Sequence, residues 1–447
     1  MKQNKSISHF LLLLVCLALA GNRLAAQNIR KLTLDETIDM SVKASGQLKI
    51  ANAKVTEAIA NTKQAWNNQL PDLKATATYM RLNTPTVDLK IKLSSSSSSS
   101  KAPSIKVNEL SYEMANLSIP VFSGFKIHYG IEAARYLEQA TKLDAENQRE
   151  DIVENAISAY CNLYKAEKTV ALVKENLREQ DQRVVDFTNK ENNGVLALND
   201  LLKAQLQQSN IELTLLDAEN NLKLTRINLS LMLGLPESTE LESDSTIFQE
   251  SGDISTIARW EQIAFDSRKD YKSLNVQEKA TETSIKMAKG DYYPGLAVTG
   301  GYIAANVPGL LSISNALNIG LGLQYNIGSI WKTPAKIDAA KARLVEITAA
   351  ESLKSDEIRM QVNQAYQNYV LAQRRIGVYQ KAIDQAKENY RISKNKYDNA
   401  LLTVTDLLDA DVALLQAQLN LSQSKADAFG AYKKLQHTAG VLSRESK

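Results

Sequence analysis

The sequence predicts a mainly α-helical fold with a transmembrane β-barrel part, built from a duplicated unit of long coiled-coil helices and two strands. The first observation is a repeat. A shift of 206 positions lays residues 200–202 on 406–408 and keeps its register without a gap for more than a hundred residues. The second is the absence of proline, the strongest helix breaker, from 121–235 and after Pro334. The third is a change to a period of two in four short segments, which is typical of strands.

The first 26 residues are typical of a secretory signal peptide. Basic residues precede an apolar run at 10–20, and small residues end at Ala26, where we expect cleavage. A retained membrane anchor is the alternative, but the run is well short of the ~20 residues that span a bilayer. Cleavage would remove Cys16 and leave Cys161 alone, so no disulfide is expected.

Composition argues against several function classes. Removal of the signal takes away three basic residues and no acidic one, which leaves 50 of each and no net field for nucleic acid. No glycine loop for phosphate is present, and His128 and His437 lack the paired spacing of a zinc site. We therefore expect no enzyme activity, no cofactor, no metal site and no nucleic-acid partner.

Six helices are predicted. The sixth is the counterpart, in the second copy, of the longest helix at 127–190. The other helices and the longest one cover 34–70, 127–190, 201–233, 257–293 and 407–439. An apolar seam with alternating steps of three and four runs from Val153 to Leu177 and recurs 206 residues later, apart from Arg359. Such a seam predicts coiled-coil packing. As one helix, 127–190 would span roughly 95 Å at ~1.5 Å per residue.

The ends of the shorter helices carry typical capping residues. Asn199 and Thr405 are candidate N-caps, and Gly234 and Gly440 are candidate terminators. Each copy therefore contains a long helix, a sharp reversal and a partner helix.

Four strands are predicted, at about 72–82, 109–121, 295–304 and 317–327. One face of each is apolar and the other small or polar, least cleanly in the second strand. A soluble sheet packed on helices is one interpretation. The lengths of about nine to eleven residues suit a tilted transmembrane strand, and Phe125 and Trp331 lie just past strands two and four, where a barrel carries interface aromatics.

A sheet in lipid must close, because an open edge would leave backbone amides without partners. Four strands cannot close, since the smallest membrane barrels have about eight. The chain must then combine strands with copies of itself, as a dimer or a trimer. The segment 83–108, with a serine run at 94–100, would be a disordered extracellular loop.

These features divide the chain into four parts. We expect a signal peptide at 1–26, a first structural repeat at 27–235, a linker at 236–253 and a second repeat at 254–447.

After the signal, nearly the whole chain resembles a TolC-type outer-membrane efflux protein. Tyr397 and residues 406–410 resemble the family's signature at the start of the last helix, and residues 117–124 resemble its strand-to-helix junction. One departure is Ala400 at the signature glycine, where the first copy keeps Gly194. Another is Leu402 in place of a basic residue found in some members.

The resemblance implies a homotrimer in the cell outer membrane, with a shared β-barrel continuous with an α-helical barrel in the periplasm. It implies a channel-tunnel of a tripartite efflux or type I secretion system, working with a periplasmic adaptor protein and an inner-membrane transporter. Outer-membrane lipid would contact the barrel, with Phe122, Phe125 and Trp331 at the membrane interface. The alternative is a soluble periplasmic coiled-coil scaffold or adaptor protein.

The resemblance also marks a periplasmic aperture. Asp406 and Asp409 are three apart on a helix and can share a face, so threefold symmetry would give two carboxylate rings. Asp200 repeats Asp406, whereas Lys203 replaces Asp409. In the family, acidic residues here form a constriction that selects against anions. Alternatively, the aspartates only favour the positive end of the helix dipole.

The two helix reversals resemble the adaptor-docking tips of the family. They contain the candidate residues Gly194, Val195, Leu196, Ala400, Leu401 and Leu402. The alternative is that these turns simply reverse the chain.

Overall fold

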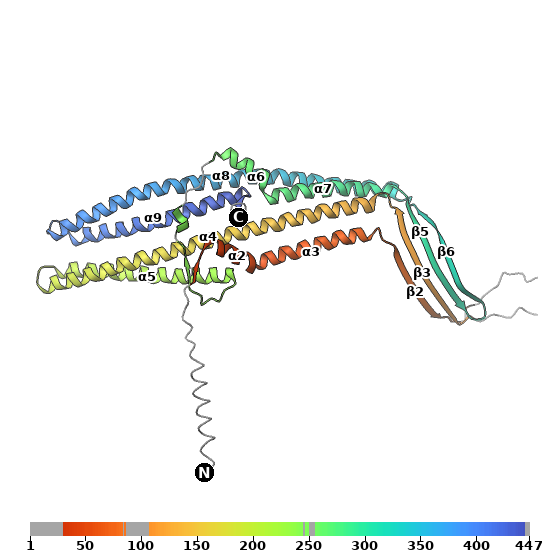
Figure 1. The fold of residues 1–447 in the computed structure, drawn as a ribbon, viewed down its shortest axis with the longest axis horizontal. Helices are drawn as coiled ribbons and strands as arrows, with labels where there is room; N and C mark the ends of the chain where they lie inside the picture. The colour runs from red at the N-terminus through yellow and green to blue at the C-terminus, as the bar shows by residue number, and fades with distance from the viewer. Residues whose placement is uncertain (1–29, 84, 86–106, 245, 250–254, 443–447) are drawn as a thin grey trace, which may run out of the picture. The chain divides into compact units, whose positions relative to one another are not determined.

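The computed structural model describes residues 30–83, 85, 107–244, 246–249 and 255–442 (Figure 1). The expected signal peptide, the serine run and most of the loop at 83–108 lie outside these residues. The chain forms two compact units. Unit 1 comprises Met1–Ile50, Glu146–Arg268 and Ser355–Lys447, and unit 2 comprises Ala51–Ala145 and Lys269–Lys354. Two long helices contribute to both units, α4 (Lys126–Asn192) and α8 (Ser329–Asp398), and α3 (Gly46–Asn67) begins in unit 1 and continues in unit 2.

Unit 1 contains the tip-forming halves of the long helices and their partner helices. Its other elements are β1 (Arg30–Leu32), α2 (Leu34–Ala44), α5 (Leu198–Leu233), β4 (Leu241–Ser243), η1 (Thr246–Gln249), α6 (Ile257–Ser267) and α9 (Val404–Thr438). The predicted repeat is visible in these boundaries: α4 and α8 end 206 residues apart, and so do the starts of α5 and α9. The fold is mainly helical, as the sequence predicts.

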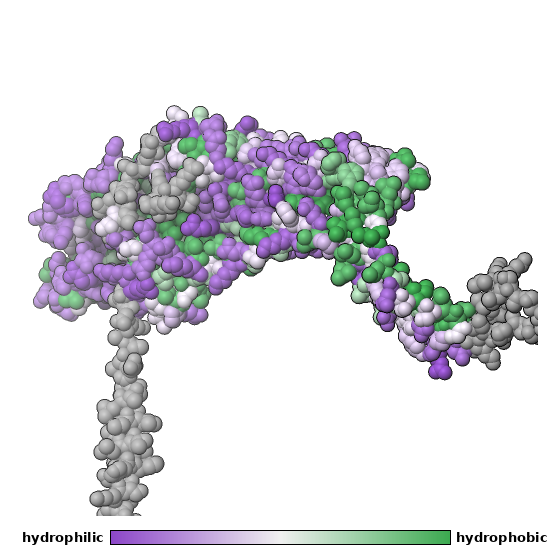
Figure 2. All heavy atoms as spheres, turned by 45° about the vertical axis from the view of Figure 1, so that its right-hand side comes forward, coloured by the Kyte–Doolittle hydropathy of each residue, from purple (hydrophilic) through white to green (hydrophobic). Residues whose placement is uncertain are grey.

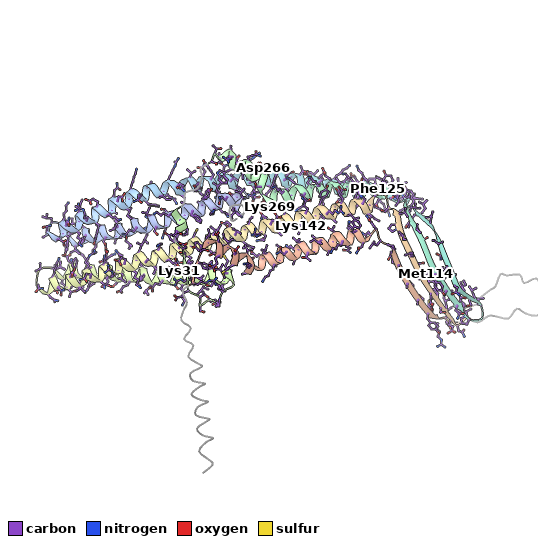
Figure 3. The ribbon with its side chains drawn as sticks, viewed as in Figure 1. Lys31, Met114, Phe125, Lys142, Asp266 and Lys269 are labelled. Atoms are coloured by element: carbon purple, nitrogen blue, oxygen red, sulfur yellow. The ribbon has the colours of Figure 1, made fainter. Side chains whose placement is uncertain are left out.

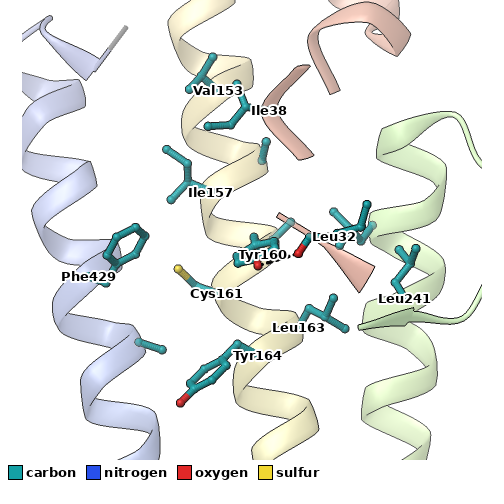
Figure 4. Close-up of a cluster of buried hydrophobic side chains, with 14 of the residues drawn as sticks. Leu32, Ile38, Val153, Ile157, Tyr160, Cys161, Leu163, Tyr164, Leu241 and Phe429 are labelled. Carbon is teal, nitrogen blue, oxygen red and sulfur yellow. Dashed lines mark hydrogen bonds between the residues drawn. The ribbon is translucent and has the colours of Figure 1, made fainter. Parts of the chain in front are cut away.

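A buried core holds unit 1 together around Tyr160 (Figure 4). The Tyr160 hydroxyl donates to the carbonyl of Leu32 at 2.9 Å and accepts from the amide of Asp244 at 2.7 Å. These bonds satisfy a hydroxyl that is fully buried, and burial raises the pKa of Tyr160 to about 12. The Tyr160 side chain thus ties α4 to the short parallel pair β1–β4.

The segment 236–253 does more than connect the repeats. Its strand β4 pairs in parallel with β1, and Leu241 is fully buried. Phe248 of η1 packs on Tyr164 with ring centroids 4.1 Å apart. Residues expected to form a linker therefore contribute to the core, because two three-residue strands give too short a pattern to read from sequence.

Unit 2 contains the sheet and the helices that lead into it. Its elements include α3 (Gly46–Asn67), β2 (Asp72–Arg81), β3 (Glu109–Phe122), α7 (Lys269–Lys289), η2 (Gly290–Tyr292), β5 (Gly295–Val307) and β6 (Leu311–Gln324). The sheet is antiparallel in the order β2-β3-β5-β6. The strands lie at the predicted places, except that β6 starts at Leu311 and ends at Gln324 rather than spanning 317–327.

One face of the sheet is apolar and exposed. Cross-strand partners share a face, and three rows of partners on this face are Leu317–Tyr302–Ala115, Leu321–Val298–Ile119 and Leu323–Leu296–Phe122. Leu317 is 82% exposed and Ile319 85%. The opposite face carries small and polar residues such as Thr299 and Gly320. In Figure 2, hydrophobic residues also gather where the sheet meets the helices.

No helix within the described part of the chain combines the length and apolar composition that spanning a bilayer requires.

Candidate functional site

The two helix reversals have the same backbone geometry. Gly194 follows α4 with φ of 69°, and Ala400 follows α8 with φ of 57°. In each turn the next amide bonds back to a helix carbonyl: Val195 to Lys190 at 2.9 Å and Leu401 to Lys396 at 2.8 Å. The second copy therefore keeps the tight turn although alanine replaces glycine, and Ala400 adopts a left-handed conformation that costs an L-residue about 1–2 kcal/mol.

Asp406 takes part in the N-cap of α9. The Thr403 hydroxyl accepts from the backbone amide of Asp406 at 3.2 Å, and it lies 2.6 Å from the Asp406 carboxylate, to which it donates. The predicted N-caps were wrong: Thr403 and Ala197 occupy these positions, and not Thr405 and Asn199. The reason is that each helix begins one residue after its cap, earlier than the apolar periodicity indicates.

The three candidate aperture residues differ in their charge environment. Asp406 and Asp409 are both exposed, whereas Leu407 and Leu408 between them are buried. Asp200 is half-buried and pairs with Lys203 at 3.2 Å. The second copy therefore presents two carboxylates on one helix face, while the first copy presents one that is already neutralised.

Each tip exposes an apolar side chain at an equivalent position, and the first tip also exposes Leu198. Val195 is 77% exposed and Leu401 75%. Their neighbours Leu196 and Leu402 are half-buried, and Leu196 packs against the cluster that closes the tip. The buried members of this cluster are Phe187, Leu201, Ala204, Val404 and Leu408. Both tips therefore combine a buried apolar base with a projecting apolar residue at equivalent positions.

A buried ion pair behind the tip was not anticipated from the sequence. Asp411 of α9 accepts from Arg183 of α4 at 3.1 Å, and their side chains are only 2% and 10% exposed. The same carboxylate oxygen also accepts from the side-chain amides of Asn176 and Gln180, and Arg183 donates to the Tyr390 hydroxyl at 2.8 Å. Arg183 of α4 thus contacts both α9, through Asp411, and α8, through Tyr390. The available signal was a charged residue, Asp411, four and three positions after the apolar Leu407 and Leu408, on the same helix face.

A cleft of about 440 Å³ lies between α4 and α8 beside this ion pair. Its walls carry both signs of charge and two tyrosines, Tyr390 and Tyr397. Lys190 lies 5.1 Å from the centre of the Tyr397 ring. Burial raises the pKa of both tyrosine hydroxyls, which favours their protonated form.

The predicted interface aromatics lie where strands become helices. Phe125, labelled in Figure 3, is 53% exposed and has φ of 63°. Its ring contacts Phe122 edge-on with centroids 5.2 Å apart, and Tyr293 at 6.5 Å. Trp331 is 66% exposed near the start of α8. The backbone at this junction leaves no room for a side chain at position 124, because a Cβ built on Gly124 would lie 2.3 Å from the Gly290 carbonyl oxygen.

The two histidines are separate from these features. His128 packs edge-on against Tyr129, and His437 lies 2.9 Å from the Asp151 carboxylate. Within the described residues, no group of three or more His, Cys, Asp or Glu side chains is arranged to hold a metal ion.

Known proteins resemble this chain over most of its length. The outer membrane efflux protein BepC of Brucella suis is 20% identical over 410 residues, which cover 90% of this chain and 85% of BepC. The outer membrane protein TolC of Vibrio cholerae is 23% identical over 327 residues, covering 70% and 73%. The crystal structure of the outer membrane protein VceC of Vibrio cholerae superposes with a TM-score of 0.75 at 19% identity, covering 91% and 96%.

The family assignment comes from the sequence. Residues 37–235 and 260–441 match the outer membrane efflux protein family, so the match covers most of both repeats. The localisation that the resemblance implied is confirmed: the chain is a protein of the cell outer membrane, with its helical part in the periplasm. The chain belongs to the outer membrane efflux protein family.

Proposed function

We propose that the chain is the outer-membrane channel-tunnel of a tripartite efflux or type I secretion system. Three copies form a ring, and each contributes four strands to one closed barrel and its long helices to a periplasmic tube. The tube gives a passive exit path for substrates delivered by an inner-membrane transporter through a periplasmic adaptor protein.

The single observation that carries this proposal is the four-stranded sheet with an exposed apolar face and two unpaired edge strands, β2 and β6. An apolar face this exposed requires lipid or a partner. Lipid in turn forbids open edges, because unpaired backbone groups cost several kcal/mol each. Joining β6 of one copy to β2 of the next removes every edge, and three copies supply twelve strands.

The proposal assigns roles to both ends of the helices. Phe122, Phe125 and Trp331 lie at the membrane interface, where aromatic rings match the headgroup region. The tips around Val195 and Leu401 dock the adaptor, and the exposed Asp406 and Asp409 carboxylates line the aperture. A soluble periplasmic scaffold is disfavoured because the family is one of outer membrane proteins.

Fractionation and mass measurement test the assembly. The mature protein should appear in the outer-membrane fraction, require detergent, and show the mass of a trimer by light scattering after correction for detergent. A monomer that stays in buffer without detergent would contradict the proposal.

Conductance in planar bilayers tests the aperture. The D406N/D409N variant removes both charges. The amide oxygen of the new side chain at position 406 can still accept a hydrogen bond from the Thr403 hydroxyl, so the N-cap is kept. We expect cation selectivity to fall at least several-fold with an unchanged trimer. The K203Q variant, which frees Asp200 from its ion pair, should change selectivity in the opposite direction. Equal selectivity in all three proteins would remove the aperture role of these residues.

A further inference from the structure

We infer the interface between copies, residue by residue, from the internal duplication: the stripe of exposed leucines on α5 packs against α8 of the next copy. This inference rests on the proposed ring. It names the surfaces and the register by which the copies meet in unit 1.

Within one chain, the two repeats meet along α4 and α9, and at the tip also through α5 and α9. Contacts run along this joint from the Asp151–His437 pair at 2.9 Å to the Arg183–Asp411 pair at 3.1 Å. Between them are the ion pairs Glu154–Lys434 and Lys165–Asp427 and the hydrogen bond from Gln423 to Thr169. At about 1.5 Å per residue, the joint is roughly 50 Å long.

The duplication maps this joint onto a second one. In a ring, the second repeat of one copy must meet the first repeat of the next copy, and such head-to-tail contacts repeat the same geometry. Adding 206 to the α4 positions gives α8, and subtracting 206 from the α9 positions gives α5. The ends of α4 and α8 at the tips and both ends of α5 and α9 obey this shift to within one residue. The joint between α4 and α9 therefore predicts a joint between α8 and the next copy's α5.

The surfaces at the predicted positions are largely apolar and are exposed in the part of the chain that the structure describes. Besides Leu198 at its start, six leucines of α5 are each more than half exposed: Leu202, Leu206, Leu213, Leu216, Leu224 and Leu231. Leu224 and Leu231 correspond to Gly430 and His437, which α4 covers within the chain. On α8, Met360 and Leu371 are 64% and 48% exposed. By the shift of 206 positions, Met360 and Leu371 are equivalent to Glu154 and Lys165 of α4.

The two joints thus differ in chemistry. Ion pairs hold the joint within the chain, whereas the joint between copies is made mainly of leucine and methionine, as is typical of permanent assemblies. At one further position of the joint between copies, the two surfaces carry complementary charges. The Thr169–Gln423 contact maps onto Arg375 and Asp217, two exposed residues of opposite sign. In Figure 1, α8 and α5 are the outer helices of the layer in which α9 and α4 lie between them.

A disulfide tests the register in the intact mature protein. A Cβ built on Gly430 lies 3.8 Å from the Cys161 sulfur, and this pair maps onto Leu224 and Gln367. The L224C/Q367C variant, oxidised in detergent, should therefore give a covalent trimer on non-reducing gels and a monomer after reduction. The L224C/M360C variant is the matched control. Its second cysteine lies on the same face but about 10 Å further along the helix, beyond disulfide reach.

The G430C variant is the positive control, because it should bond to native Cys161 within one chain and run as a monomer. If G430C oxidises and the mass is that of a trimer, but L224C/Q367C forms no link or M360C links equally well, the inferred interface is wrong and the proposed function stands. If the protein is monomeric in detergent, the proposed function fails as well.

Charge reversal gives an independent measurement. In the L224C/Q367C background, D217R should slow the cross-link at least fivefold, and D217R/R375D should restore it. A double variant as slow as the single one would overturn this pairing.

Discussion

The Arg183–Asp411 pair allows a quantitative test of how the two repeats are joined. Consider the substitution Asp411→Leu. It leaves the guanidinium of Arg183, which is 10% exposed, without a counter-charge, and it leaves the fully buried Gln180 amide without its acceptor. Removing one partner of a buried pair costs about 3 kcal/mol at the lower end of the usual range, and an unpaired buried amide costs about 1 kcal/mol more. We expect the free energy of local opening of α9 to fall by about 4 kcal/mol relative to wild type.

The double variant R183M/D411L should be less damaged than D411L. It removes both charges but leaves the buried side-chain amides of Gln180 and Asn176 without their acceptor. The Asn176 bond is long at 3.5 Å, so the main loss is that of Gln180, about 1–2 kcal/mol. The variant R183M alone should cost about 3 kcal/mol, because it leaves a carboxylate that is 2% exposed. These values predict a coupling of several kcal/mol between the two positions in a double-mutant cycle.

Hydrogen–deuterium exchange of peptides from the first half of α9 measures these energies. Each 1.4 kcal/mol corresponds to a tenfold faster exchange, so D411L should exchange about 700-fold faster than wild type and the double variant about tenfold faster. The matched control is R178M, which breaks the exposed Arg178–Glu175 pair on the same helix and should have almost no effect. If D411L exchanges like R178M, or the double variant equals the sum of the singles, the reasoning is refuted.

Three further predictions concern single positions. Ala400→Gly should stabilise the second tip by about 1 kcal/mol, because it relieves the left-handed backbone conformation of the alanine. Gly194→Ala should destabilise the first tip by a similar amount, although its added Cβ would meet no atom within 4 Å. Thermal unfolding measures both effects, and melting temperatures equal to that of wild type would contradict the prediction. Burial raises the pKa of the Cys161 thiol to about 12, so a thiol reagent at pH 8 should label it only after denaturation; rapid labelling of the folded protein would be the contrary result. Burial also raises the pKa of Glu167 despite its bonds to Ser243, so its contribution to stability is present below about pH 4.5 and is lost as pH rises through the folded pKa. Melting temperatures at pH 4 and 7.5 should therefore show wild type losing stability relative to E167Q as pH rises, and a constant difference would argue against it.

Sequence periodicity predicted the helices well for a local reason. A coiled-coil seam repeats every few residues, so the pattern that fixes α4 and α8 is contained in the segments themselves. The repeat of 206 positions added the equivalence of the two turns, which the matching φ angles of Gly194 and Ala400 bear out. Strand positions followed from alternation. Strand β6 began earlier than predicted, because its pairing with β5 shifts register between Ile303 and Ala305.

Contacts between distant segments could not be predicted in this way. The Arg183–Asp411 bond joins residues 228 positions apart, and the Tyr160–Leu32 bond joins residues 128 apart. Asp406 and Asp409 were predicted to share a helix face from their spacing, but the structure alone assigns the Asp406 carboxylate to the Thr403 cap.

The sequence by itself therefore determined the fold class, the duplication and the family resemblance, because each depends on patterns along the chain. Only the tertiary structure decided which faces remain uncovered. The α5 leucines follow a helical period that would equally suit a buried core helix, and their exposure depends on where α4 and α9 meet. Burial is a property of the packed molecule, since a side chain is removed from water only by residues that the fold brings to it.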